Sequence, residues 1–143
     1  MTTIAYDGKV LAGDQLMVAN GTPMGIPKVH RIATVDGTVY LVGGAGNVGD
    51  CQAFAHWVRK GLPAGEKPKL TNCTMLVVCR GKITQYDNEF EHPSEISKDF
   101  WAVGSGANYA LGVMAMGGSA QDAVRLATTL DINTGWGMDV VRA

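Results

Sequence analysis

Short apolar runs separated by glycine-containing turns dominate the first part of the chain. Because two-residue turns with positive φ join antiparallel strands, a pair of β-branched runs around an Asp-Gly or Arg-Gly dipeptide predicts a β-hairpin. Three such pairs occur, at residues 2–6 with 9–12, 30–35 with 38–42, and 73–79 with 82–86. We therefore expect paired antiparallel strands here.

Three other segments carry apolar residues three and four positions apart, which is the spacing of one helix face. The pattern predicts helices over residues 50–60 and 107–115 and over a third segment that follows Ser119 and extends to about residue 130. Ser119 and Asp122 resemble a capping box, with Asp in place of the preferred Glu.

The remaining segments complete the expected order of elements. Residues 61–72 contain two Pro and two Gly without any period, which indicates a connecting loop, and residues 138–141 can form a last strand. Strands, a helix, a hairpin, two helices and a strand predict an antiparallel α+β fold rather than repeated βαβ units. With 143 residues, the chain is expected to form a single domain over 1–143.

Composition and charge exclude several classes of protein. Apolar residues make up 46% and charged residues 17%, which is typical of a folded globular protein. The net charge is -1 and no basic stripe is present, so we expect no nucleic-acid partner. No apolar stretch reaches the ~20 residues that span a bilayer, and no secretory signal precedes the fold, which predicts a cytoplasmic protein without a membrane segment.

The three cysteines, Cys51, Cys73 and Cys79, show no C-x-x-C spacing. This argues against a disulfide framework and a zinc site, so we interpret them as small buried hydrophobic residues. No metal or other cofactor is expected.

Residues 44–49 spell G-x-G-x-x-G, the pattern of a dinucleotide-binding turn. That site also requires a parallel βαβ unit and an acidic residue about 20 positions later at a strand end. Here that window is the Pro-rich loop, and Glu66 has no strand before it. The glycines then form either a turn whose N–H groups stabilise a negative charge or a tight turn that simply requires small residues.

Thr2 directly follows Met1, so removal of the methionine would expose an amino-terminal threonine. Such a residue carries its own base, because its α-amine has a pKa near ~7.7 to 8.

Six segments in order then give a family resemblance. T-T-I-A-Y, L-A-G-D, P-K-V, G-G-A-G-N-V-G-D, A-V-G-S-G-A-N-Y-A and D-I-N-T-G-W-G together resemble proteasome β subunits, most of all the bacterial threonine-peptidase subunits that pair with an unfolding ATPase. The resemblance extends over nearly the whole chain. It implies the N-terminal-nucleophile (Ntn) hydrolase fold, a four-layer αββα sandwich of two antiparallel sheets between helical layers.

The same resemblance implies a function and a set of site residues. It implies a threonine endopeptidase that cleaves proteins or peptides inside a homo-oligomeric ring, six- or seven-fold and possibly stacked. Thr2 would be the nucleophile, Lys28 would lower the pKa of its amine and hydroxyl, Asp14 would pair with Lys28, and Gly46 would donate to the oxyanion. Polar residues around the amine would be Ser105, Asp131 and Thr134.

The chain also departs from the family. It is shorter, and the loop at residues 61–72 lies where other members have a second long helix, which predicts a shortened helical layer. A chain that retains Met1 would have a blocked amine. A catalytically silent ring or scaffold protein is therefore the alternative.

Overall fold

The computed structural model describes residues 2–88 and 93–143. Within them the strands form a four-stranded sheet, a five-stranded sheet and a two-stranded ribbon, accompanied by three helices. Every strand pairing in this part of the chain is antiparallel, as predicted from the hairpins. The result is a mixed fold of antiparallel sheets and helices.

The four-stranded sheet has the order β10 (Trp101–Val103), β1 (Ile4–Tyr6), β2 (Val10–Asp14) and β11 (Met138–Arg142). Two helices, α2 (Ala107–Ala115) and α3 (Ala120–Leu130), cover one of its faces. The interface between these helices and the sheet is rich in alanine, which lets the helix and sheet backbones approach closely. Its buried alanines are Ala5, Ala12, Ala102, Ala110, Ala120 and Ala123.

The five-stranded sheet has the order β5 (Val29–Ala33), β6 (Val39–Gly46), β7 (Cys73–Cys79), β8 (Lys82–Asp87) and β9 (Ser94–Ile96). Helix α1 (Val48–Arg59) packs on one face. Phe54 makes edge-to-face ring contacts with Trp57 at 5.3 Å and Tyr86 at 4.9 Å between centroids. These aromatic contacts hold α1 on the sheet.

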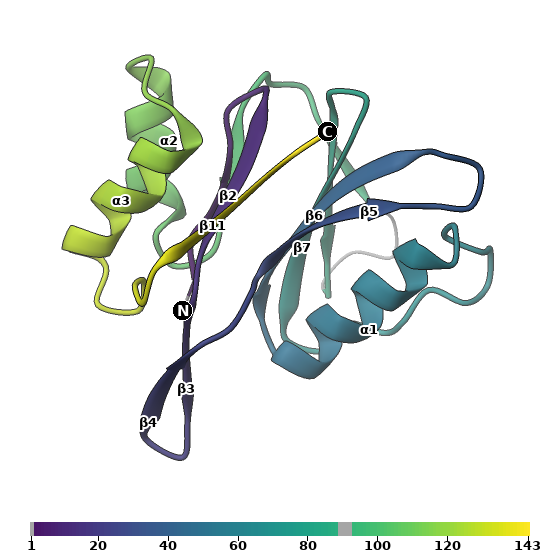
Figure 1. Cartoon of the computed structure of the whole chain (residues 1–143), viewed down its shortest axis with the longest axis horizontal. Coiled ribbons are helices and arrows are strands. Elements are labelled where there is room, and N and C mark those ends of the chain that lie inside the picture. Colours follow the sequence, from purple (N-terminus) through teal and green to yellow (C-terminus); the bar gives the residue numbers. More distant parts are fainter. Residues whose placement is uncertain (1, 89–92) are drawn as a thin grey trace.

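The two sheets face each other across a separate apolar core that includes Ile4, Leu11, Leu41 and Leu76. Figure 1 shows α2 and α3 on one outer side of the pair of sheets and α1 on the other. Alternation along β6 explains how one strand serves two cores, because Leu41 points to the opposite sheet and Val42 to the α1 side. Polar residues at neighbouring strand ends of the two sheets can therefore come together at one end of the molecule.

Several predicted elements agree with the structure within a few residues. All three helices are present, and the Ser119–Asp122 capping box forms as the sequence indicates. Helix α1 begins two residues earlier than expected because Asn47 caps it, accepting from the Asp50 N–H. Neither helix nor strand occurs between α1 and β7, which confirms the loop at residues 61–72.

A hairpin that the sequence analysis did not predict joins the two sheets. It consists of β3 (Leu16–Ala19) and β4 (Thr22–Gly25) and extends from the body of the molecule. Its turn is Asn20-Gly21, with φ of 52° and 77°, the dipeptide most typical of a two-residue hairpin turn. That signal was available, but the flanking strands are largely exposed and show no apolar alternation.

The short strands β9 and β10 were also not predicted, since each has only three residues and no clear apolar alternation. Strand β5 ends at Ala33 rather than near residue 35. The reason is a local turn in which the Asp36 carboxylate accepts from the Thr38 N–H at 3.0 Å and from the Thr34 hydroxyl. Side-chain bonds of this kind end a strand by giving the backbone another partner.

Candidate active site

Thr2 lies two residues before the first residue of β1 and is only 4% exposed. The segment 104–106 approaches it so closely that two glycines are required. A Cβ at Gly104, where φ is +101°, would clash with the Thr2 carbonyl oxygen, and one at Gly106 would clash with the Thr3 hydroxyl. The Gly-Ser-Gly sequence thus brings Ser105 against Thr2.

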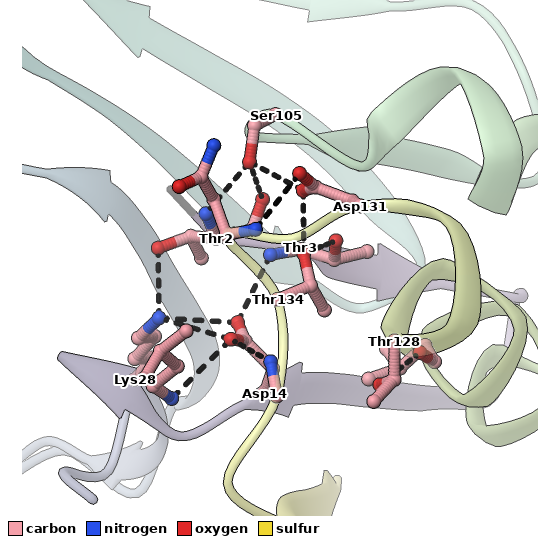
Figure 2. A network of polar contacts seen from close by, with 12 residues as sticks. Thr2, Thr3, Asp14, Lys28, Ser105, Thr128, Asp131 and Thr134 are labelled. Atoms are coloured by element: carbon pink, nitrogen blue, oxygen red, sulfur yellow. Dashed lines mark hydrogen bonds and ion pairs between the residues drawn. The ribbon is translucent and has the colours of Figure 1, made fainter. Parts of the chain in front are cut away.

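On one side of Thr2 lies an ion pair that contacts its hydroxyl (Figure 2). Lys28 Nζ lies 2.9 Å from Thr2 Oγ1 and 3.1 Å from Asp14 Oδ1. The Asp14 side chain is fully buried and that of Lys28 is 7% exposed. Asp14 is nevertheless well satisfied, because it also accepts backbone N–H bonds, from Thr3 at 3.0 Å, Gly135 at 3.0 Å and Leu16 at 3.3 Å.

The fold explains this ion pair. Asp14 is the last residue of β2 in one sheet, and Lys28 directly precedes β5 in the other, with the β3–β4 hairpin connecting them. Burial lowers the pKa of Lys28, and the attraction of Asp14 opposes this only in part. Lys28 therefore carries a charge that it gives up more readily than a solvated lysine does.

On the other side of Thr2 lies a chain of hydroxyl groups that ends on a carboxylate (Figure 2). Thr2 N donates to Ser105 Oγ at 3.0 Å, and Ser105 Oγ donates to Asp131 Oδ2 at 2.6 Å. The Thr134 hydroxyl donates to the same carboxylate oxygen at 2.7 Å. Burial raises the pKa of Asp131, but the bonds from Ser105 and Thr134 outweigh it, so the net pKa is lowered and the carboxylate stays ionised.

Thr3 belongs to this network and was not predicted from the sequence. Its side chain is fully buried, and its hydroxyl lies 2.8 Å from the Thr134 hydroxyl. Through its N–H it also bonds Asp14, so one residue connects the two sides of Thr2. The available signal was a second threonine directly before an apolar run. A hydroxyl that becomes buried there needs a hydrogen-bond partner.

Two cavities open beside Thr2, and both are lined by Thr2, Lys28 and Gly46. The larger has a volume of about 340 Å³ and the smaller about 170 Å³. Gly46 has φ +120°, and a Cβ there would clash with the Asn72 carbonyl oxygen. Its place beside the nucleophile candidate therefore depends on its being glycine.

The structure brings the seven predicted site residues together. Six share the hydrogen-bond network around Thr2, namely Thr2, Asp14, Lys28, Ser105, Asp131 and Thr134. Gly46 lines both cavities together with Thr2 and Lys28. Their catalytic roles stay predictions. Gly44 and Gly46 lie in β6, whose two neighbouring strands are both antiparallel to it, so the parallel unit of a dinucleotide site is not formed there.

Across residues 2–88 and 93–143, no group of three or more His, Cys, Asp or Glu side chains is placed to hold a metal ion. In the same residues, no helix is long and apolar enough to cross a membrane.

Neither a scan against protein-family models nor a search of curated proteins gives a match. Solved structures, in contrast, are similar over nearly the whole chain. An Anbu (Gly-1) mutant from Hyphomicrobium sp. strain MC1 has a TM-score of 0.71 at 13% identity, covering 100% of this chain and 82% of its own. Eukaryotic HslV from Trypanosoma brucei has a TM-score of 0.69 at 15% identity, covering 99% of both chains.

A third similar structure is Thiobacillus denitrificans BPH in complex with epoxomicin. Its TM-score is 0.66 at 17% identity, and the match covers 98% of this chain and 96% of that chain. These neighbours are all proteasome-type Ntn hydrolases, so the chain has the fold of that class of protein. The resemblance to proteasome β subunits is thereby confirmed at the level of fold.

Proposed function

We propose that this chain is a threonine-type endopeptidase subunit, with Thr2 as nucleophile after removal of Met1. The observation that carries the proposal is the network around Thr2, which contacts its hydroxyl oxygen on one side and its main-chain nitrogen on the other. A threonine used only for packing does not require a buried ion pair at its hydroxyl. An N-terminal nucleophile requires both its hydroxyl and its amine to be positioned.

In this mechanism the charge of Lys28 acts on the hydroxyl. At 2.9 Å from Thr2 Oγ1, the ammonium group stabilises the alkoxide that forms as the oxygen attacks a peptide carbonyl. Asp14 holds Lys28 in place, and its own three backbone N–H partners fix the carboxylate. The ion pair thus supplies a fixed charge without leaving a buried charge unpaired.

The second half of the mechanism concerns the amine. Once Met1 is removed, Thr2 N becomes an α-amine that takes the hydroxyl proton and later gives it to the leaving amine. Ser105 and Asp131 orient this nitrogen through the bonds described above. Gly46 would place its N–H beside the developing oxyanion, a contribution of ~3 kcal/mol for such a donor.

The wider architecture follows the same proposal. The two facing sheets with helices on both outer sides support a four-layer αββα sandwich, formed by a single domain over 1–143, with α1 as a shortened layer. The similarity to HslV and Anbu structures supports a homo-oligomeric ring that acts on peptide or protein substrates, with an unfolding ATPase as partner. A cytoplasmic location stays a prediction from the sequence.

Peptide hydrolysis by three forms of the protein tests the proposal. The wild type is expected to cleave a fluorogenic peptide, and Thr2→Ser is expected to keep measurable activity because it keeps a hydroxyl on the same amine. Thr2→Ala should lose at least about 1,000-fold in kcat/KM while its circular dichroism and unfolding temperature stay near those of the wild type. Equal activity in wild type and Thr2→Ala would overturn the assignment.

One observation favours the silent alternative. No helix lies between α1 and β7, where the resemblance to proteasome β subunits implies a second long helix, and a smaller helical layer would change which surfaces a ring can use. A protein that assembles into rings with Met1 removed yet cleaves no peptide would support a scaffold role.

A further inference from the structure

Three sulfur atoms gather at and behind the wall of the larger cavity. Cys51 lies in the first turn of α1, and Cys73 and Met75 lie two residues apart on β7. Cys51 Sγ is 3.2 Å from Cys73 Sγ, and Cys73 Sγ is 3.2 Å from Met75 Sδ. Cys51 and Met75 both line the cavity that Thr2 and Lys28 line.

The backbone leaves room for this sulfur cluster. A Cβ at Gly44 would lie 2.6 Å from Cys51 Sγ and 2.7 Å from Met75 Sδ, closer than real Cβ contacts come. Gly44 is therefore required by the two sulfur-containing side chains that face it. This accounts for one glycine of the 44–49 segment that neither a nucleotide nor an oxyanion explains.

We propose that Cys51 and Cys73 form a reversible dithiol–disulfide pair in the cavity wall, oxidised by small peroxides that enter beside Thr2. All three cysteines are free thiols in the structure. A disulfide requires the two sulfur atoms to close from 3.2 Å to about 2.05 Å. This is a shift of about 1.2 Å, within reach of side-chain rotation and a small movement of the first turn of α1.

The two thiols have unequal roles. Cys51 is partly exposed at the cavity, whereas Cys73 is 3% exposed. The hydrogen bond between the Cys51 and Cys73 thiols lowers the pKa of Cys51 against the opposing effect of burial, and the charge of Lys28 adds to the lowering. The same hydrogen bond, together with burial, raises the pKa of Cys73. Cys51 is therefore the sulfur that meets the oxidant, and Cys73 is the resolving thiol.

The chemistry balances with hydrogen peroxide as the oxidant. The Cys51 thiolate attacks one peroxide oxygen, so an S–O bond forms, the O–O bond breaks and hydroxide leaves, which takes up the proton that the thiol released. The Cys73 thiol then attacks the sulfur of the Cys51 sulfenic acid, so the S–S bond forms and the S–O bond breaks. Two thiols and one peroxide thus give one disulfide and two waters.

Oxidation also changes the space next to Thr2. The disulfide draws Cys51 toward β7 and alters the wall that a substrate side chain would contact. This consequence for turnover rests on the proposed function, whereas disulfide formation does not. The chain would then cleave peptides more slowly under oxidising conditions and recover after reduction, as proteins with transient redox-sensing disulfides do.

Intact mass spectrometry and thiol counting of the native protein after mild peroxide treatment test the pair. The matched control is Cys79→Ser, because Cys79 lies at the other end of β7 and does not line the cavity. Wild type is expected to lose about 2 Da and to fall from three titratable thiols to one, reversibly with dithiothreitol. Cys79→Ser should lose the same mass, and its digest should contain a peptide pair joined through Cys51 and Cys73.

Removing either partner should change the product. Cys73→Ala leaves Cys51 without a resolving thiol, so it should gain oxygen, by about 16 Da per step, and react with a sulfenic-acid reagent. Cys51→Ser should show neither reaction at comparable peroxide. Oxidised wild type that keeps its three thiols, or a disulfide that requires Cys79, would overturn the proposal.

The rate of peptide cleavage before and after oxidation tests separately whether the disulfide affects Thr2. In wild type and in Cys79→Ser, oxidation should slow peptide cleavage at least about threefold, and Cys51→Ser should be insensitive. If peptide cleavage is absent in all forms, the proposed function fails while the mass result still decides the disulfide. A disulfide that forms without any change in rate would overturn the link to Thr2.

Discussion

Thr2 lies between two polar regions that are built in opposite ways. On the hydroxyl side, Asp14 and Lys28 form an ion pair with side chains 0% and 7% exposed, held by backbone N–H groups. On the nitrogen side, Thr2 N contacts the neutral hydroxyl of Ser105, and the hydroxyls of Ser105 and Thr134 both donate to Asp131. The Asp131 carboxylate is much more solvated than that of Asp14.

The two regions therefore suit different tasks at Thr2. A buried charge interacts strongly and cannot be replaced by water, so we expect the loss of either charge on the hydroxyl side to remove most of the activity. On the nitrogen side, solvent reaches Ser105 and Asp131, so water can replace part of the contacts that orient the nitrogen. We therefore expect changes on the hydroxyl side to cost far more activity than changes on the nitrogen side.

Lys28→Ala should have the largest effect. It removes the charge at Thr2 Oγ1 and leaves the buried Asp14 carboxylate without its cation. We expect kcat/KM to fall at least about 1,000-fold and the free energy of unfolding to fall by about 3 kcal/mol. The exposed Lys9→Ala is the control and should leave both unchanged. A Lys28→Ala rate within twofold of wild type would contradict the comparison.

The second largest effect should be the fall of wild-type kcat/KM at alkaline pH. Because burial lowers the pKa of Lys28 below its ordinary 10.5, the site loses its charge at a lower pH than a solvated lysine would. The charged form is the active one, so kcat/KM should fall as pH rises through the lowered pKa, by about tenfold per unit.

Lys28→Arg sharpens this prediction, since a guanidinium stays charged throughout the range. Its alkaline fall should be absent, even if its overall rate is lower. An unchanged alkaline limb in Lys28→Arg would show that another group titrates.

Ser105→Ala tests the nitrogen side. It removes the acceptor 3.0 Å from Thr2 N and breaks the contact with Asp131. We expect a loss of about 10- to 30-fold in kcat, with KM nearly unchanged, because the amine loses orientation rather than its chemistry. A loss as large as that of Lys28→Ala, measured in the same assay, would remove the distinction between the two sides.

Thr134→Val should have the smallest effect. It keeps the volume but removes a hydroxyl that donates to Asp131 and lies 2.8 Å from the Thr3 hydroxyl. We expect about a threefold loss of kcat and a loss of about 1 kcal/mol in stability. Thermal unfolding with a peptide assay measures both, and Thr128→Val is the matched control away from Thr2. An effect above about 30-fold would place Thr134 among the essential groups.

Much of this could be predicted from the sequence, because hairpin turns and helix periodicity are local signals. The ordered motifs indicated Thr2, Asp14 and Lys28, although their contact depends on two different sheets meeting. Local sequence patterns could not predict contacts that form only by tertiary packing. Thr3 between the two sides of the site, the clash positions of Gly104 and Gly106, and the Cys51–Cys73 contact all depend on where distant elements come to lie.

Intact mass spectrometry before and after incubation with a peptide epoxyketone tests whether Thr2 is a competent nucleophile. This reagent requires both the hydroxyl and the α-amine of a terminal threonine. We expect loss of Met1 and one adduct per chain in the wild type, with no adduct in Thr2→Ala. A Met-free wild type that forms no adduct would contradict the claim that Thr2 is a competent nucleophile.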